Sequence, residues 1–269
     1  MPSSTEGLEL AQLAFYVLTS LPAIYCLIRH GRIGLLGWIY VFAMCGLRLV
    51  GNGIAYHSLS TTGEPNRAAS IISGIGLSPL LLAALGILHE ANHSIQSTLP
   101  AILSGFGMLI PHIVIGGGIG LAAASGSHTV LLKVGLIVFA TGWSMVVALV
   151  LVSAKANATH RRLGKERKVW FATPISAKDS SNESNVKLLF GIMIALPLIG
   201  IRLIYAIVVA FKYGSPSGGS LAVEVIFGTL PEFLVMITYL SAGIVTRNLA
   251  SGRNERGVGP AYDSAYVSV

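Results

Sequence analysis

The sequence is poor in charged residues and in cysteine. Only 11% of its 269 residues are charged, whereas an ordinary soluble domain carries roughly 25%. A disordered protein, which needs high charge and low hydrophobicity, is excluded because 53% of the residues are hydrophobic. Two cysteines are too few for a disulfide scaffold. Together with a mean hydropathy of +0.73, this composition predicts a multi-pass integral membrane protein.

Seven apolar stretches are long enough to cross a bilayer. A membrane-spanning helix needs about 20 mainly apolar residues, because about 30 Å of hydrocarbon is crossed at about 1.5 Å per residue. The predicted spans are Leu8–Ile28, Ile33–Tyr56, Ala69–Leu88, Leu99–Ala123, Thr129–Ser153, Leu188–Phe211 and Leu221–Val245. Only residues 125–128 separate the fourth span from the fifth, so one longer kinked span is an open alternative.

The fold class predicted from these spans is an all-α membrane protein with seven transmembrane helices. Residues 1–249 form the transmembrane domain, and residues 250–269 form a flexible cytosolic tail. If the amino terminus is outside, the cytosolic segments hold 13 Lys and Arg residues, and the outside holds 3, counting Lys133 at the outer end of the fifth span. The positive-inside rule therefore places the carboxyl terminus in the cytosol. The net charge of +7 is then a topology signal, and no nucleic-acid partner is expected.

The longest cytosolic segment is the basic loop 154–187. Its first half contains Thr159–Phe171, in which basic residues precede the adjacent aromatics Trp170 and Phe171. This composition suits binding to anionic lipids of the inner leaflet. The second half, Ile175–Asn185, is rich in Ser and Asn and is predicted to be flexible.

Two motifs around the second span carry a family resemblance. They are Arg29-His-Gly-Arg-Ile-Gly-Leu-Leu-Gly-Trp-Ile-Tyr40 and Gly46-Leu-Arg-Leu-Val-Gly51. They resemble a fungal family of seven-span integral membrane proteins catalogued as a domain of unknown function, whose members show a similar Arg-His-Gly turn, Gly-Trp pair and intramembrane Arg followed by Gly. The stretches 77–88 and 231–244 also fit, so the resemblance covers most of the chain. It implies a membrane fold and no particular activity.

A membrane-embedded enzyme of lipid or terpenoid metabolism is the alternative class. Fungal terpene cyclases are similar in size and use intramembrane carboxylates as proton donors. However, spans two to six contain no carboxylate, and aromatic residues make up only 8% of the chain, whereas a carbocation cavity should be lined by aromatic faces. The sequence has no metal-ligand spacing and no cofactor motif, so neither a metal nor a cofactor is expected.

Ionisable side chains inside the spans form the candidate site. Each costs about 2.5–3.5 kcal/mol on insertion scales, so they should face the bundle interior and have partners. Arg48 and Arg202 fall in the outer half of the membrane, within reach of Glu232 near its midplane. The candidate ligand-binding residues are Arg48, Asn52, His112, Arg202, Tyr205 and Glu232.

Two interpretations of this cluster stay open. In the first, Glu232 neutralises Arg48 and Arg202, and the salt bridges only fix how the helices are rotated. In the second, two arginines against one deep carboxylate leave positive charge for a small polar or anionic ligand. The second interpretation predicts a sensor or transporter with a pocket in the outer half of the bundle.

A weak internal repeat pairs the second span with the sixth. Gly46-Leu-Arg-Leu-Val50 is similar to Gly200-Ile-Arg-Leu-Ile204, and Gly76-Leu-Ser-Pro79 is similar to Gly228-Thr-Leu-Pro231. Because both pairs lie four spans apart, spans one to three and five to seven could be parallel three-helix repeats, as in sugar transporters of the SWEET type.

Overall fold

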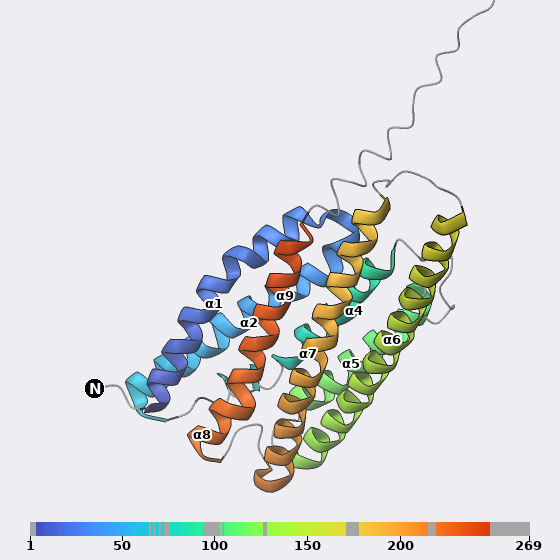
Figure 1. Cartoon of the computed structure of the whole chain (residues 1–269). Coiled ribbons are helices and arrows are strands. Elements are labelled where there is room, and N and C mark those ends of the chain that lie inside the picture. The colour runs from blue at the N-terminus through green and yellow to red at the C-terminus, as the bar shows by residue number, and fades with distance from the viewer. Residues whose placement is uncertain are drawn as a thin grey trace, which may run out of the picture.

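The chain folds into a bundle of long helices (Figure 1). The computed structural model describes residues 4–64, 66, 68–69, 71–72, 76–93, 103, 105–125, 128–170, 178–214 and 219–247. Its elements are α1 (Ser4–Arg29), α2 (Gly31–Thr62), α4 (Leu77–Asn92), α5 (Gly105–Ala124), α6 (Thr129–Trp170), α7 (Lys178–Tyr213), α8 (Leu221–Val223), the π-helix η3 (Glu224–Thr229) and α9 (Leu230–Val245). The described residues contain no strand, which confirms the all-α class.

Within the described residues, six helical segments are long and apolar enough to cross a membrane. They are α1, α2, α5, α6, α7 and the continuous run α8–η3–α9. Large apolar side chains cover their outward faces; Leu18, Leu21 and Ile28 on α1, for example, are 69%, 69% and 72% exposed. Outward faces as apolar as these are typical of helices that contact lipid. The chain is therefore built as a multi-pass membrane protein.

The third predicted span differs from the others in the structure. It forms α4, which has 16 residues, begins later than the predicted Ala69 and ends at Asn92 rather than Leu88. Nearly every residue of α4 is buried, including Glu90 at 0% exposure. The boundary was mispredicted because the polar sequence after Leu88 indicated a loop, whereas these polar side chains are buried against other helices.

The other boundaries mostly match the prediction. The fourth and fifth spans are separate helices, α5 and α6, which pack as a hairpin, so the single kinked span is wrong. The basic loop is largely helical, because α6 continues to Trp170 and α7 already begins at Lys178. Within the stretch Ile175–Asn185 that was predicted to be flexible, the described residues from Lys178 onward are helical. The predicted tail 250–269 lies outside the described residues.

The two ends of the bundle carry different polar features. At one end α1 turns into α2 at His30, and α9 ends nearby (Figure 1). Gly31 makes this turn with a φ of +62°, in the left-handed region that favours glycine. We call it the basic end, because the exposed Arg29 and Arg32 lie there. The opposite end, where α1 begins and α2 ends, is the amino-terminal end.

Helix α4 lies at the centre because glycines let α2 approach it closely. A Cβ on Gly37 would lie 2.8 Å from the backbone nitrogen of Ile87, and Gly86 faces the backbone of Gly37. Around this contact α2 packs on both α1 and α4, while α7 packs on α4, α6 and α9. The side chains that form the candidate site project from α1, α2, α7 and the η3–α9 run.

Candidate functional site

The centre of the site is an ion pair between α2 and α9. Arg48 donates through Nε and Nη2 to the two carboxylate oxygens of Glu232. Both residues are 3% exposed. This confirms that the two charges face the bundle interior, as the insertion cost of ionisable groups required. A bidentate pair of this kind fixes orientation as well as charge.

Helix α1 adds polar partners that the sequence analysis missed. Tyr16, fully buried, donates its hydroxyl to Glu232 Oε1. Gln12, one turn earlier, accepts a 3.3 Å hydrogen bond from Asn52 Nδ2. A tyrosine or a glutamine in an apolar helix does not have to pair with a charged group, so neither residue predicts a contact with Glu232 or Asn52. Their spacing of four residues, which places both on one face of α1, is a weak indication.

The second arginine is held differently from the first. Arg202 Nε lies 3.8 Å from Glu232 Oε2, too far for a hydrogen bond, and has no hydrogen-bond partner among the described residues. The residue is 9% exposed. Its guanidinium lies over the Tyr205 ring, with Cζ 5.5 Å from the ring centre. Tyr205 in turn packs against Gly228, where a Cβ would lie 3.3 Å from its ring.

Two further carboxyl groups reach this cluster from the amino-terminal end. Glu9 on α1 interacts electrostatically with both Glu224 and Arg48. Its Oε2 atom is buried and has no hydrogen-bond partner in the described part of the chain. Glu224 also interacts with Arg202. The two arginines therefore face more carboxyl groups than the single deep carboxylate expected from the sequence, and the cluster contains both acidic and basic side chains.

The seventh span is irregular beside this cluster. Residues Glu224–Thr229 form a π-helix, which continues directly into α9. Such insertions into a helix are frequent at functional sites, because they shift the register of the side chains around them. Here the π-helix begins at Glu224, leads into α9 with its Glu232, and carries Gly228 against Tyr205.

His112, the remaining predicted site residue, is placed elsewhere. It lies on α5, half-buried, and its Nδ1 atom lies 2.7 Å from the Met108 carbonyl of the same helix. Its ring centre is 6.4 Å from that of Tyr40. The described contacts bring Arg48, Asn52, Arg202, Tyr205 and Glu232 into one region of the bundle, and His112 is not among them.

A second buried polar cluster lies at the basic end. His30 Nδ1 is 2.7 Å from Glu90 Oε1, and His30 Nε2 is 2.9 Å from the Gly243 carbonyl oxygen. Trp38 Nε1 donates a 3.1 Å hydrogen bond to Glu90 Oε2. Sequence reasoning assigned His30 and Glu90 to loops, where polar residues need no explanation. The signal was the Arg-His-Gly and Gly-Trp motif itself, which supplies both His30 and Trp38.

A third polar cluster joins α4 to α6. Ser153 donates a 2.5 Å hydrogen bond to Asn92 Oδ1, and Asn157 Nδ2 donates to the same oxygen at 3.3 Å. The three residues are at most 4% exposed. This cluster accounts for the extension of α4 beyond the predicted end at Leu88, because Asn92, the last residue of the helix, contacts Ser153.

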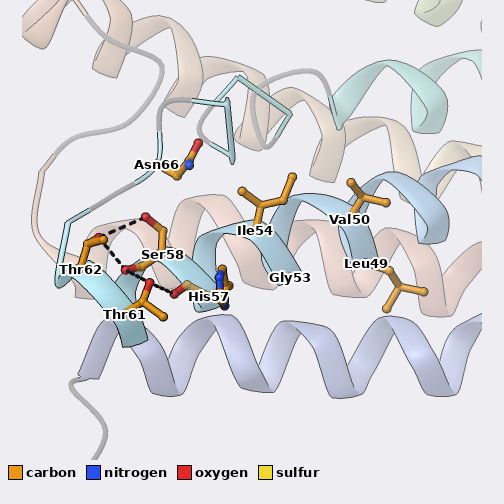
Figure 2. A pocket seen from close by; sticks show the side chains of 9 residues that line it. All are labelled: Leu49, Val50, Gly53, Ile54, His57, Ser58, Thr61, Thr62 and Asn66. Atoms are coloured by element: carbon orange, nitrogen blue, oxygen red, sulfur yellow. Dashed lines mark hydrogen bonds between the residues drawn. The ribbon is translucent and has the colours of Figure 1, made fainter.

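A groove of 620 Å³ lies on α2, away from all three clusters. Figure 2 shows the residues that line the groove; Asn66 lies on the segment that faces α2, and the other labelled side chains belong to α2. Val50, Gly53 and His57 project roughly opposite to Arg48, because each residue turns an α-helix by about 100°. The groove is therefore on the outer side of α2, and it is not the predicted arginine pocket. Its lining residues are Leu49, Val50, Gly53, Ile54, His57, Ser58, Thr61, Thr62 and Asn66.

The chemistry that the arginine cluster allows is recognition through charge. Among the described residues no group of three or more His, Cys, Asp or Glu side chains is arranged to hold a metal ion. Glu232 already accepts hydrogen bonds from Arg48 and Tyr16. Arg202 is the charged donor of the cluster that makes no hydrogen bond to Glu232.

A family model described as "Domain of unknown function (DUF7702)" matches residues 3–178 and 171–249, and the chain therefore belongs to this family. The two matched segments overlap at 171–178, between α6 and α7. No curated protein and no solved structure matches the chain. The match confirms the resemblance to a family of unknown function, while a fungal origin stays a prediction.

Proposed function

We propose that this member of the DUF7702 family senses or transports a small polar or anionic ligand, which binds between α1, α7 and α9 at Arg202. One observation carries the proposal. Arg202 Nε is buried and lacks a hydrogen-bond partner among the described residues, whereas the neighbouring Arg48 donates to both carboxylate oxygens of Glu232. A buried charged donor without a hydrogen bond is costly, and a ligand acceptor would remove that cost.

A carboxyl group on the Arg48 side of the cluster narrows the class of ligand, because Glu9 interacts with Arg48 and with Glu224, which in turn interacts with Arg202. Glu9 Oε2 is also buried without a described hydrogen-bond partner. A ligand that offers an acceptor to Arg202 and a donor to Glu9 would satisfy both atoms. Small molecules with a carboxylate and an amino or hydroxyl group have this pair of functions. Asn52 and Tyr205 complete the proposed site, in which Arg48 and Glu232 are the fixed charges.

The alternative enzyme class is disfavoured by how Glu232 is bonded. A terpene-cyclase-like reaction needs an intramembrane carboxylic acid that gives its proton to the substrate. Both oxygens of Glu232 instead accept hydrogen bonds from Arg48, and one also accepts the hydroxyl of Tyr16. A carboxylate bonded in this way serves as a structural charge and not as an acid.

The proposed topology has seven spans, with the amino terminus outside and the basic end in the cytosol. Three-helix repeats are part of the same proposal. Helix α2 is flanked by α1 and α4, and α7 is flanked by α6 and α9. The glycines of the repeated motif support it too, because Gly76 lies against the Arg48 guanidinium and Gly228 lies against Tyr205 beside Arg202.

The basic segment 159–171 would then lie against the inner leaflet. We propose that it binds anionic lipids there, because its composition combines basic residues with two adjacent aromatics. Helix α6 continues through most of this segment, to Trp170.

The function is tested by thermal unfolding of the purified full-length protein against a panel of small carboxylates, amino acids and hydroxy acids. A ligand at 100 times its Kd stabilises a one-site protein by about 2.7 kcal/mol. We expect at least one compound to raise the melting temperature of the wild type. Arg202→Met should remove that rise, because the unpaired donor is lost.

The matched control is Arg32→Met, which removes an exposed arginine at the basic end. It should keep the ligand-induced rise. If no compound stabilises the wild type, or if Arg202→Met responds as the wild type does, the site does not bind such ligands. The cluster would then be the structural salt bridge of the first interpretation.

A further inference from the structure

The contacts of His30 fix how many protons the second cluster holds. A carbonyl oxygen can only accept, so the 2.9 Å contact with Gly243 requires a proton on His30 Nε2. On the other side of the ring, His30 Nδ1 and Glu90 Oε1 are 2.7 Å apart, and one proton must lie between them. Either the imidazole carries it and Glu90 is ionised, or Glu90 carries it and the imidazole is neutral. Both arrangements contain the same number of protons.

Loss of that shared proton breaks the cluster. A neutral imidazole has one N–H, while both of its nitrogens face acceptors. If the N–H points to Glu90, a lone pair faces the Gly243 carbonyl; if it points to Gly243, a lone pair faces an ionised carboxylate. One of the two contacts must therefore open. The bond to the charged acceptor is the stronger, so the contact with Gly243 on α9 is the one lost.

The site is closed and contains few other titratable groups. A Cβ on Gly34 would lie 2.6 Å from Glu90 Oε2, and Gly243 lies directly against Trp38, so these glycines close the cluster on two sides. His30 and Glu90 are 1% and 0% exposed. On α1, Cys26 interacts with Glu90. The described contacts from α2 and α9 come from Trp38 and Gly243, which are uncharged. The flanking Arg29 and Arg32 are exposed.

We infer that His30 and Glu90 form a proton-binding pair, and that its proton holds the basic end of α9 against the turn between α1 and α2. With the proton bound, His30 bridges α4 and α9. Without it, α9 is released at Gly243. Because α9 also carries Glu232, binding of the proton and of any ligand at Arg202 should influence each other reciprocally. The inference itself requires no ligand, so it can fail or succeed independently of the proposed function.

The deciding variant is Glu90→Gln. A glutamine has the shape of the glutamate, and its amide can donate to His30 Nδ1 while its carbonyl accepts from Trp38 Nε1. A neutral His30 can then still donate to Gly243, so every hydrogen bond is made without the shared proton. We therefore expect Glu90→Gln to fold and to lose the dependence on pH.

The measurement is thermal unfolding of the full-length protein in lipid nanodiscs between about pH 6 and 9, a range that spans histidine titration. The stability of the wild type should fall as the pH rises, by up to about tenfold in the folding equilibrium per pH unit for one proton. Glu90→Gln should be flat over the alkaline part of this range. His57→Gln, which removes an exposed histidine on α2, should keep the dependence of the wild type.

A second readout does not depend on the stability of Glu90→Gln. The His30 and Trp38 rings are 4.5 Å apart, so the fluorescence of Trp38 should report the protonation of its neighbour. In a Trp143→Phe, Trp170→Phe background the emission should change in a single one-proton transition, which His30→Gln abolishes. No transition in that background, or a pH dependence of Glu90→Gln equal to that of the wild type, would overturn the inference.

Discussion

Arg48 donates to both carboxylate oxygens of Glu232, a residue 184 positions later in the chain, and so ties α2 to α9. Arg202 approaches the same carboxylate only to 3.8 Å. The two arginines occupy equivalent positions in the motifs Gly46–Val50 and Gly200–Ile204, but only Arg48 makes hydrogen bonds that join two helices.

This difference predicts unequal effects on stability. Arg48→Met should destabilise the protein by about 3–5 kcal/mol, because it leaves a buried carboxylate without its bonded counter-charge. Arg202→Met should cost clearly less, since no described hydrogen bond is lost. Chemical unfolding of both variants in detergent measures the difference. Equal losses would mean that Arg202 neutralises Glu232 as much as Arg48 does.

Gly243 should tolerate no side chain. A methyl group there would overlap the Trp38 ring and lie 2.8 Å from Cys26 Sγ. Gly243→Ala is therefore expected to cost about 1–3 kcal/mol, as overpacking of a core does. The control is Gly46→Ala on α2, where nothing lies within 4 Å of the added methyl. That substitution should be neutral or slightly stabilising in the same melting experiment.

The polar contact between α4 and α6 should also be measurable. Ser153→Ala removes the shorter hydrogen bond to Asn92 Oδ1 and should cost about 1–2 kcal/mol. Ser144→Ala is the matched control, because Ser144 is exposed and donates only to the Ala140 carbonyl of its own helix. Its unfolding midpoint should stay close to that of the wild type. If Ser144→Ala lost as much stability as Ser153→Ala, the loss would reflect the change in helix propensity and not the contact with Asn92.

The topology can be tested by glycosylation. The sequons at Asn92, Asn157 and Asn182 should stay unmodified if the basic end is cytosolic. Asn92 and Asn157 are weak reporters, however, because both are buried against Ser153. A glycosylation tag fused to the amino terminus should be modified, and the same tag at the carboxyl terminus should not. An endoglycosidase-sensitive carboxyl-terminal fusion would reverse the orientation.

The arginine cluster could be predicted because its signal is energetic. Charged side chains are rare in apolar helices and must face partners, so Arg48, Arg202 and Glu232 were expected to meet, and they do. Tyr16 could not be predicted in the same way. A tyrosine is tolerated on either face of a membrane helix, and only the fold shows that its hydroxyl reaches Glu232.

The cluster around His30 was missed for the opposite reason. Polar residues at the ends of predicted spans are expected to be solvated, so the sequence does not predict that His30 and Glu90 are buried. Their burial depends on where α4 ends and on the close approach of α2 at Gly34, and neither is encoded in local hydropathy. His112 shows the reverse error, since it is a polar residue in mid-span whose need for a partner is met by its own helix.

The central position of α4 has a consequence for biogenesis. At 16 residues it spans about 24 Å, less than the hydrocarbon thickness, and it contains the buried Glu90. It presents almost no surface to lipid. The free energy of inserting such a segment alone into a bilayer is small, because its side chains are stabilised by contacts with the other helices and not by lipid. We therefore expect membrane insertion of this part of the chain to require assembly of the bundle around it.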